Sequence, residues 1–357
     1  MKVLRNSMDN KVYHHHSPIT LENGKQLSNL TVAYHSFGKL NEAKNNVVWV
    51  CHALTANSNV LDWWNGLFGE NFLFNPNEYF IICPNNLGSC YGTSGPTSIN
   101  PNTQKPYYSS FPEITVRDMV QVHELLRLHL NIEKIDILIG GSQGGQQALE
   151  WNIYQPNIFN QLILLATNAV HSPWGIAFNE SQRMAIFADE TYFDNKPNGG
   201  SKGLAVARSI ALLSYRNYKA YYKTQSESNN DLPAIFKAAS YQNYQGKKLV
   251  DRFNAYSYVI LSKAMDSHNV ARNKQDLSTA LKKITASTLI IGINSDILFP
   301  VQEQQFLADN ILNAQFETIN SDFGHDGFLV ETKKITAIIK KFLDNNTIKK
   351  NKSLHVS

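Results

Sequence analysis

Several features are scarce in this sequence of 357 residues, and each scarcity excludes a class of protein. Cysteine occurs only three times, as Cys51, Cys83 and Cys90, without the spacing of a disulfide framework or a metal site. No apolar run approaches the roughly 18 residues that span a bilayer, and the first residues lack a signal-peptide pattern. We therefore expect a reduced, cytoplasmic protein that holds no metal and does not act at a membrane.

Charge of one sign is also scarce. The formal net charge is +4 and the pI about 8.7, and no Lys/Arg stripe indicates nucleic-acid binding. Basic residues gather at the C-terminus, where we expect residues 346–357 to form a solvated, disordered tail. Three consecutive histidines, His14, His15 and His16, cannot all face one ion, because successive side chains of an extended segment point to opposite faces. An edge strand or a loop is the better interpretation of that run.

What the sequence does contain is a regular alternation of short apolar runs with helical patterns. Near-continuous Val/Ile/Leu runs predict strands buried on both faces, as in a mostly parallel sheet. Between two of them Met119, Val122 and Leu126 recur at helical spacing, with Thr115 as a possible cap. The alternation predicts an α/β fold with helices on both faces of a central sheet. The predicted strands are residues 46–50, 79–83, 135–139, 162–166, 288–292 and 315–319.

The alternation stops between residues 171 and 275. That stretch has helical patterns rich in Tyr, Asn, Gln and Ser and no clear strand. We interpret it as a helical lid inserted in a core made of residues 1–170 and 276–345. Such a lid would cover the carboxyl ends of the strands, where open α/β sheets bind their ligands. The opening residues 10–37 alternate in a way that suits an antiparallel edge hairpin.

A glycine-rich turn carries the first chemical signal. Gly140-Gly141-Ser142-Gln143-Gly144-Gly145 follows the third predicted strand and precedes a helical pattern. A Gly-x-Ser-x-Gly turn in that position is the nucleophile elbow of the α/β-hydrolase fold. It predicts Ser142 as a nucleophile at the top of the sheet. The backbone N–H of Gln143, at a helix N-terminus, is then a predicted oxyanion donor.

A serine needs a base and an orienting acid to act as a nucleophile. In this fold they follow the serine in the chain order acid, then histidine. Asp296 stands at the end of the strand at 288–292, and His325 lies in a turn before the final helical pattern. We predict that His325 takes the serine proton and that Asp296 holds its ring.

The segment His52-Ala53-Leu54-Thr55 follows the first buried strand. This is where the fold supplies its second oxyanion donor. We assign that role to the backbone N–H of Leu54, with Thr55 as a neighbouring substrate-binding residue.

Longer motifs resemble the homoserine O-acetyltransferase family, over about residues 12 to 344. They are Leu87-Gly88-Ser89-Cys90-Tyr91-Gly92-Thr93-Ser94-Gly95-Pro96, Phe111-Pro112-Glu113-Ile114-Thr115-Val116-Arg117-Asp118-Met119, the elbow extended to Trp151, and Gly324-His325-Asp326-Gly327-Phe328-Leu329. One departure is visible, because Gln143 and Gln147 stand where the commoner family pattern has methionines. Gln143 would act through its backbone, so the departure leaves the predicted triad intact.

The resemblance implies an acetyl transfer from acetyl-CoA to the side-chain hydroxyl of L-homoserine, a step towards methionine. It implies a triad of Ser142, Asp296 and His325, and homoserine contacts from Arg208, Tyr215 and Asp326. The residues suit a zwitterion, because an arginine grips a carboxylate bidentately and a carboxylate accepts from an ammonium. It also implies a homodimer formed through the lid and no tightly bound cofactor.

Three alternatives remain open. Succinyl-CoA could replace acetyl-CoA, or serine could replace homoserine, by changes in a few pocket contacts. A plain esterase or thioesterase would share the triad without needing Arg208 and Asp326. A non-catalytic binding protein on the same fold is disfavoured by the intact Ser, Asp and His.

Overall fold

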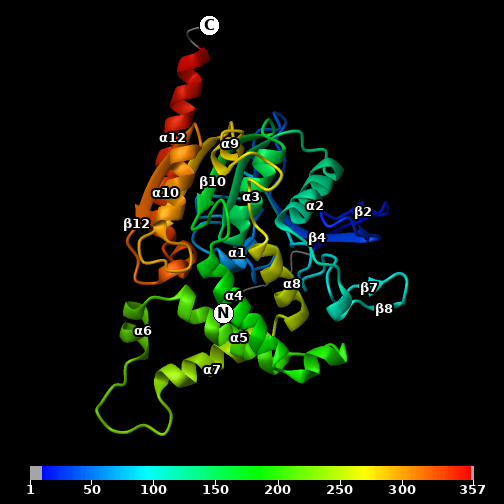
Figure 1. The fold of residues 1–357 in the computed structure, drawn as a ribbon. Helices are drawn as coiled ribbons and strands as arrows, with labels where there is room; N and C mark the ends of the chain where they lie inside the picture. Colours follow the sequence, from blue (N-terminus) through cyan, green and yellow to red (C-terminus); the bar gives the residue numbers. More distant parts are fainter. Residues whose placement is uncertain (1–9, 355–357) are drawn as a thin grey trace.

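The computed structural model describes residues 10–354, and their centre is a twisted sheet of eight strands (Figure 1). Six strands run parallel to one another, while β1 and β4 pair antiparallel at one edge and β4 pairs antiparallel with β6. All six predicted strands are present, and the predicted edge hairpin is the β1–β4 pair. In sheet order the strands are β1 (Lys11–His15), β4 (Leu30–Phe37), β6 (Phe80–Pro84), β5 (Val47–Cys51), β9 (Ile135–Gly141), β10 (Phe159–Leu165), β11 (Ser287–Ile293) and β12 (Ala314–Ile319).

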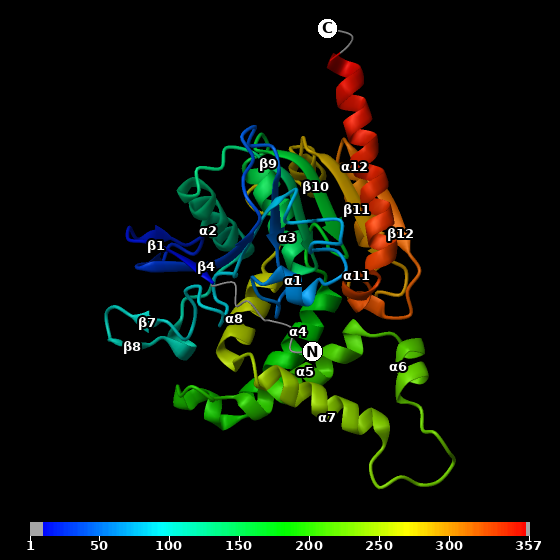
Figure 2. The same cartoon turned by 180° about the vertical axis from the view of Figure 1, so that it is seen from behind.

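The parallel strands are buried because helices cover both faces of the sheet. In β5 every residue is buried, with Trp49 packing into one apolar cluster and Val48 and Val50 into the other. Figure 2 shows the second face, which α12 and α1 cover. The first face is covered by α2 (Val116–His129), α3 (Gln143–Tyr154) and α10 (Val301–Asn310), and the second by α1 (Val60–Trp63), α11 (Gly327–Val330) and α12 (Thr332–Leu354).

Local sequence signals set the ends of these helices. The predicted cap Thr115 accepts a hydrogen bond from the backbone N–H of Asp118, whose carboxylate accepts from the Thr115 N–H in return. Such a reciprocal capping box pairs donors that a helix N-terminus otherwise leaves without acceptors. The remaining short elements are β2 (Ile19–Thr20), β3 (Gln26–Leu27), β7 (Ile99–Asn100), β8 (Lys105–Pro106), η1 (Tyr108–Ser110) and α9 (Leu277–Leu281).

A group of helices lies beyond one end of the sheet (Figure 1). It runs from residue 173 to residue 266, inside the interval 171–275 that we predicted as a lid. One of its helices, α5, packs against η3 (Gly324–Asp326), the turn that carries the predicted base. The lid consists of α4 (Pro173–Phe187), η2 (Glu190–Asp194), α5 (Ser201–Tyr215), α6 (Tyr218–Gln225), α7 (Lys237–Val250) and α8 (Ala255–Asp266).

The last helix reaches into the segment that we expected to form a tail. Helix α12 continues to Leu354, so residues 346–354 are helical, and residues 355–357 lie outside the described part. The helical pattern ending at Leu343 simply extends through the lysine-rich segment, because lysine is a good helix former.

The histidine run begins in β1, at the edge of the sheet, where His14 pairs with Thr31 and His15 with Leu30. Within residues 10–354 no three His, Cys, Asp or Glu side chains are grouped to hold a metal ion. The same residues form no helix long and apolar enough to cross a membrane.

Candidate active site

Ser142 lies at the sharp turn between β9 and α3. Its backbone has φ 55° and ψ −127°, a strained conformation for a residue with a side chain. The turn needs glycine beside it, because a Cβ at Gly144 would lie 2.0 Å from the carbonyl oxygen of Cys51. This close approach of α3 to β5 holds the serine at the carboxyl end of the sheet, as the elbow pattern predicts.

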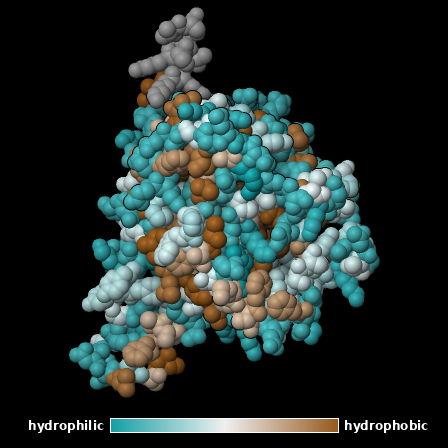
Figure 3. All heavy atoms as spheres, viewed as in Figure 1, coloured by the Kyte–Doolittle hydropathy of each residue, from teal (hydrophilic) through white to brown (hydrophobic). Residues whose placement is uncertain are grey.

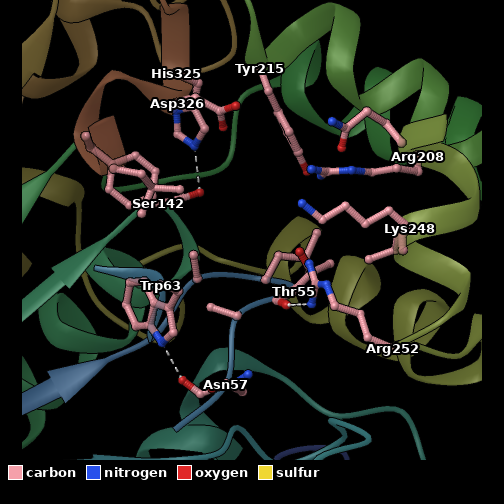
Figure 4. A pocket seen from close by; sticks show the side chains of 17 residues that line it. Thr55, Asn57, Trp63, Ser142, Arg208, Tyr215, Lys248, Arg252, His325 and Asp326 are labelled. Atoms are coloured by element: carbon pink, nitrogen blue, oxygen red, sulfur yellow. Dashed lines mark hydrogen bonds between the residues drawn. The ribbon is translucent and has the colours of Figure 1, made fainter. Parts of the chain in front are cut away.

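Three predicted side chains meet in a chain of hydrogen bonds. His325 Nε2 lies 2.9 Å from Ser142 Oγ (Figure 4), and His325 Nδ1 lies 2.6 Å from Asp296 Oδ2. The other oxygen of Asp296 accepts from the backbone N–H groups of Leu298 and Phe299, at 2.8 and 2.9 Å. The serine, acid and histidine are respectively 6%, 5% and 3% exposed, so water screens these contacts weakly.

The two predicted oxyanion segments lie beside the serine. Gln143 is the first residue of α3, and the first N–H groups of a helix have no acceptor within it. Leu54 lines the same cavity as Ser142. The two segments are also linked, because Gln147 Nε2 lies 3.4 Å from the carbonyl oxygens of both His52 and Gln143.

His52 fixes the loop that carries Leu54. Its Nδ1 lies 2.8 Å from the Ala53 carbonyl oxygen, and its Nε2 accepts from the backbone N–H of Asn86 at 3.0 Å. Burial lowers the pKa of His52 to about 4, so the ring is neutral at pH 7 and can both donate and accept.

A cavity of about 330 Å³ opens above the serine, between the core and the lid. Core residues form its floor and two walls, and α5 and α7 close it from the lid side (Figure 4). The loop that follows β5 also lines the cavity, and Trp63 helps to hold it because its Nε1 donates to the Asn57 carbonyl oxygen at 2.7 Å. Its lining residues are Ala53, Leu54, Thr55, Ala56, Asn57, Trp63, Ser142, Arg208, Tyr215, Gln245, Lys248, Leu249, Arg252, His325, Asp326, Phe328 and Leu329.

The predicted substrate-binding residues all line this cavity. The ring of Tyr215 lies between the base and the arginine, 5.8 Å from the ring of His325 and 5.5 Å from Arg208 Cζ. Thr55 lies across the cavity in the loop after β5.

Asp326 has a partner that the sequence analysis did not predict. Arg216 Nε lies 2.8 Å from Asp326 Oδ2 and forms an ion pair with it. Burial raises the pKa of Asp326, and Arg216 and Arg208 oppose that shift. Arg216 directly follows Tyr215 in the chain, so its position was a usable signal.

Two further basic residues were also missed. Lys248 and Arg252 lie four residues apart at the end of α7 and just beyond it, and both line the cavity. Nothing in the sequence distinguishes them from the other lysines and arginines of an amphipathic lid helix.

Comparisons with known proteins agree with the geometry. Residues 46–332 match a family model described as the alpha/beta hydrolase fold. A curated homoserine O-acetyltransferase from Cyclobacterium marinum is 44% identical over 340 residues, which cover 95% of this chain and 97% of that protein. A second, from Nostoc punctiforme, is 44% identical and covers 91% of this chain and 93% of its own.

Solved structures show the fold but do not separate activities. The homoserine O-acetyltransferase from Bacillus anthracis has a TM-score of 0.86 at 24% identity, covering 94% of this chain and 97% of that one. Esterase E22 has a TM-score of 0.84, also at 24% identity, covering 94% and 99%. At such low identity these two likenesses establish the α/β-hydrolase fold alone.

Proposed function

Because this chain belongs to the homoserine O-acetyltransferase family, we propose that it transfers an acetyl group from acetyl-CoA to the side-chain hydroxyl of L-homoserine. One observation carries the proposal beyond the fold. The Ser142–His325–Asp296 chain lies in one cavity with a lid arginine, Arg208, and a carboxylate, Asp326. A hydrolase of simple esters needs the Ser–His–Asp triad but has no use for Arg208 and Asp326.

The first half of the proposed reaction loads the serine. His325 Nε2 takes the proton from Ser142 Oγ as the oxygen attacks the thioester carbonyl carbon. The backbone N–H groups of Leu54 and Gln143 stabilise the negative oxygen of the tetrahedral intermediate. The intermediate collapses, the C–S bond breaks, and the thiolate leaves with the proton from His325. Asp296 stabilises the imidazolium throughout.

The second half passes the acetyl group on. His325 removes the proton from the homoserine hydroxyl, and the oxygen attacks the acetyl carbonyl of acetyl-Ser142. The Ser142 Oγ–carbon bond then breaks, and the serine regains its proton from His325. The lid supports transfer over hydrolysis, because it limits the access of water to a site whose serine is already buried.

We assign the amino-acid end of homoserine to the lid side of the cavity. Arg208 would bind its carboxylate, and the π face of Tyr215 positions that guanidinium. Asp326 would accept from its ammonium, and Arg216 opposes the rise that burial causes in the pKa of this carboxyl group. Thr55 would contact the substrate from the opposite wall.

The proposed nucleophile is tested by mixing the enzyme with acetyl-CoA alone and recording free thiol. We expect a burst of about one thiol per active site from the wild type and from Ser181→Ala, which changes an exposed serine on α4. Ser142→Ala should show no burst, since no acetyl-enzyme can form. A burst that survives in Ser142→Ala would refute the assignment.

The reaction itself is tested by a steady-state screen of acetyl-CoA and succinyl-CoA against homoserine and serine. We expect acetyl-CoA with homoserine to give the highest kcat/KM and a new O-acyl amino acid. A second candidate, an esterase or thioesterase, is favoured by the fold shared with esterase E22. Thiol release that no amino acid stimulates would establish the hydrolase instead.

Two further proposals rest on the family and not on this site. We propose that the chain forms a homodimer through the lid, whose surface displays apolar residues in the lower part of Figure 3. On the lid, Leu232, Tyr218 and Ile235 are 89%, 79% and 69% exposed, and light scattering measures the mass of the dimer directly.

We also propose a cytoplasmic location, with which the free thiols of the three cysteines agree.

A further inference from the structure

The lid side of the cavity carries more positive charge than homoserine can use. Arg208, Lys248 and Arg252 all line it. Asp326 is the one carboxylate among its lining residues, and it is already paired with Arg216 from outside the lining. Three cations therefore face a cavity whose own negative charge is neutralised within the protein.

The cations lie at different depths. Arg208 is half-buried and lies one aromatic ring away from His325. Lys248 and Arg252 are exposed, and Figure 4 shows both side chains on the lid wall, across the cavity from Ser142. Homoserine brings one carboxylate, which Arg208 is placed to bind. The two outer cations are left for a ligand that reaches from solvent to the serine.

The acyl donor, acetyl-CoA, is a ligand of this kind, because it can reach from solvent to the serine. In acetyl-CoA an uncharged pantetheine arm separates the thioester from a nucleotide that carries several phosphate charges. We propose that Lys248 and Arg252 form the subsite for those phosphates, while the arm runs down the cavity to Ser142. This inference rests on the proposed function. Lysine and arginine are the residues that bind phosphate oxygens through charge-assisted hydrogen bonds.

Lys248 and Arg252 both keep N–H donors that can bind a phosphate. Lys248 has no ion pair and no side-chain hydrogen bond with any side chain that the structure describes. Arg252 Nη1 donates to the Thr55 carbonyl oxygen at 2.6 Å and to Tyr91 Oη at 2.7 Å. A guanidinium has five N–H donors, so Nη2 and Nε remain for a phosphate while Nη1 fixes the arginine.

The subsite also predicts which substrates depend on the two outer cations. Both cations are exposed, so they act mainly on the capture of the donor and not on the chemistry at the serine. Their effect should therefore appear with a donor that carries phosphates and vanish with one that lacks them. The binding of homoserine should not depend on these two cations, because its carboxylate binds deeper in the cavity, at Arg208.

The test compares acetyl-CoA with acetyl-pantetheine, which keeps the thioester and the arm but lacks the nucleotide. Lys248→Met keeps most of the stem and removes the charge, whereas Arg252→Gln also disturbs the contact to Thr55. Lys248→Met is therefore the primary variant. Lys247→Met, at the adjacent exposed lysine that does not line the cavity, is its matched control.

We expect Lys248→Met to lower kcat/KM for acetyl-CoA about fivefold and that for acetyl-pantetheine less than twofold. The KM for homoserine should stay within twofold, and the loss should shrink as salt is raised. Lys247→Met should match the wild type with both donors. The Lys248→Met, Arg252→Gln double variant should lose more with acetyl-CoA than either single variant.

Two results would overturn the subsite. An equal loss with both donors would place Lys248 in the chemistry or at homoserine, and no loss with either would make it a solvated surface lysine. Failure of the proposed function looks different, since the wild type itself would then either release no thiol from acetyl-CoA or release thiol at a rate that homoserine does not raise. That outcome would remove this inference together with its premise.

Discussion

At the scale of single residues, the site depends on how Asp296 is held. Its Oδ1 is occupied by two backbone N–H groups, so Oδ2 is directed at His325 Nδ1. A histidine that donates from Nδ1 must accept at Nε2, which is the atom that faces Ser142. The acid therefore selects the tautomer that can act as a base.

This predicts the effect of Asp296→Asn. The asparagine oxygen can still accept from Leu298 and Phe299, which turns its NH₂ group towards His325 Nδ1 and favours the wrong tautomer. We expect kcat to fall by about 10³- to 10⁴-fold in the acetyl-transfer assay. Asp322→Asn, at an exposed position in the loop between β12 and η3, should change kcat less than twofold. A loss below tenfold in Asp296→Asn would contradict the role given to the acid.

The sequence predicted the residues whose roles follow from chain order. Ser142, Asp296 and His325 follow the carboxyl ends of β9, β11 and β12 within a few residues, so their meeting at one sheet edge follows from a parallel sheet. Lys248 and Arg252 were missed for the opposite reason. Their importance arises only when lid helices fold back over the core, and a sequence pattern does not specify that contact.

At the scale of elements, the elbow depends on close approach of backbone to backbone. The nearest atoms to a Cβ at Gly144 are the carbonyl oxygen and carbon of Cys51, at 2.0 and 2.7 Å. Both are main-chain atoms of a buried central strand, so neither can rotate away as a side chain would. A side chain there must separate α3 from β5.

Gly144→Ala should therefore lower the free energy of unfolding by about 3 kcal/mol or more, measured by urea denaturation. Gly24→Ala is the matched comparison. That glycine has φ +82° but nothing within 4 Å of an added Cβ, so we expect only the backbone cost of about 1–2 kcal/mol. Equal costs at the two positions would show that the approach of α3 to β5 is not tight.

Element boundaries show where sequence patterns succeed and fail. Strand β5 was predictable because all its residues are apolar and buried, which only a central strand requires. The end of α12 was not, because beyond Leu343 the sequence loses its apolar stripe and mixes lysines with asparagines, which have lower helix propensity. Without an apolar stripe the sequence gives a weak signal there, and the tail from residue 346 stays a prediction.

At the scale of the whole molecule, several buried histidines couple folding to pH. Burial lowers the pKa of His52, His123 and His171 to about 4 and that of His268 to about 3. Each is neutral in the folded protein at pH 5–6, whereas an unfolded histidine with its ordinary pKa near 6.5 is protonated there. The unfolded state thus binds more protons, and acid favours it.

Buried carboxyl groups whose pKa is raised act in the opposite direction, and Glu303 shows this most clearly. Burial is the main cause that raises the pKa of Glu303 to about 7, and Asp296 adds to it. Between its ordinary pKa of 4.5 and 7 the folded state holds a proton that the unfolded state has lost. Glu303 therefore contributes stability that is complete below pH 4.5 and is lost as the pH rises through 7. Between pH 5 and 6.5 the four histidines outweigh Glu303.

We therefore expect the free energy of unfolding to be highest above pH 6.5 and to fall on acidification, on the order of 2 kcal/mol per pH unit near pH 5.5. Urea denaturation from pH 5 to 8 measures it. Glu303→Gln removes the opposing contribution, so its curve should be steeper than that of the wild type from pH 5 to about pH 7. Glu133→Gln, at an exposed site, should follow the wild type. A wild-type stability that rises on acidification from pH 6.5 to 5.5 would show that the buried histidines are not held neutral.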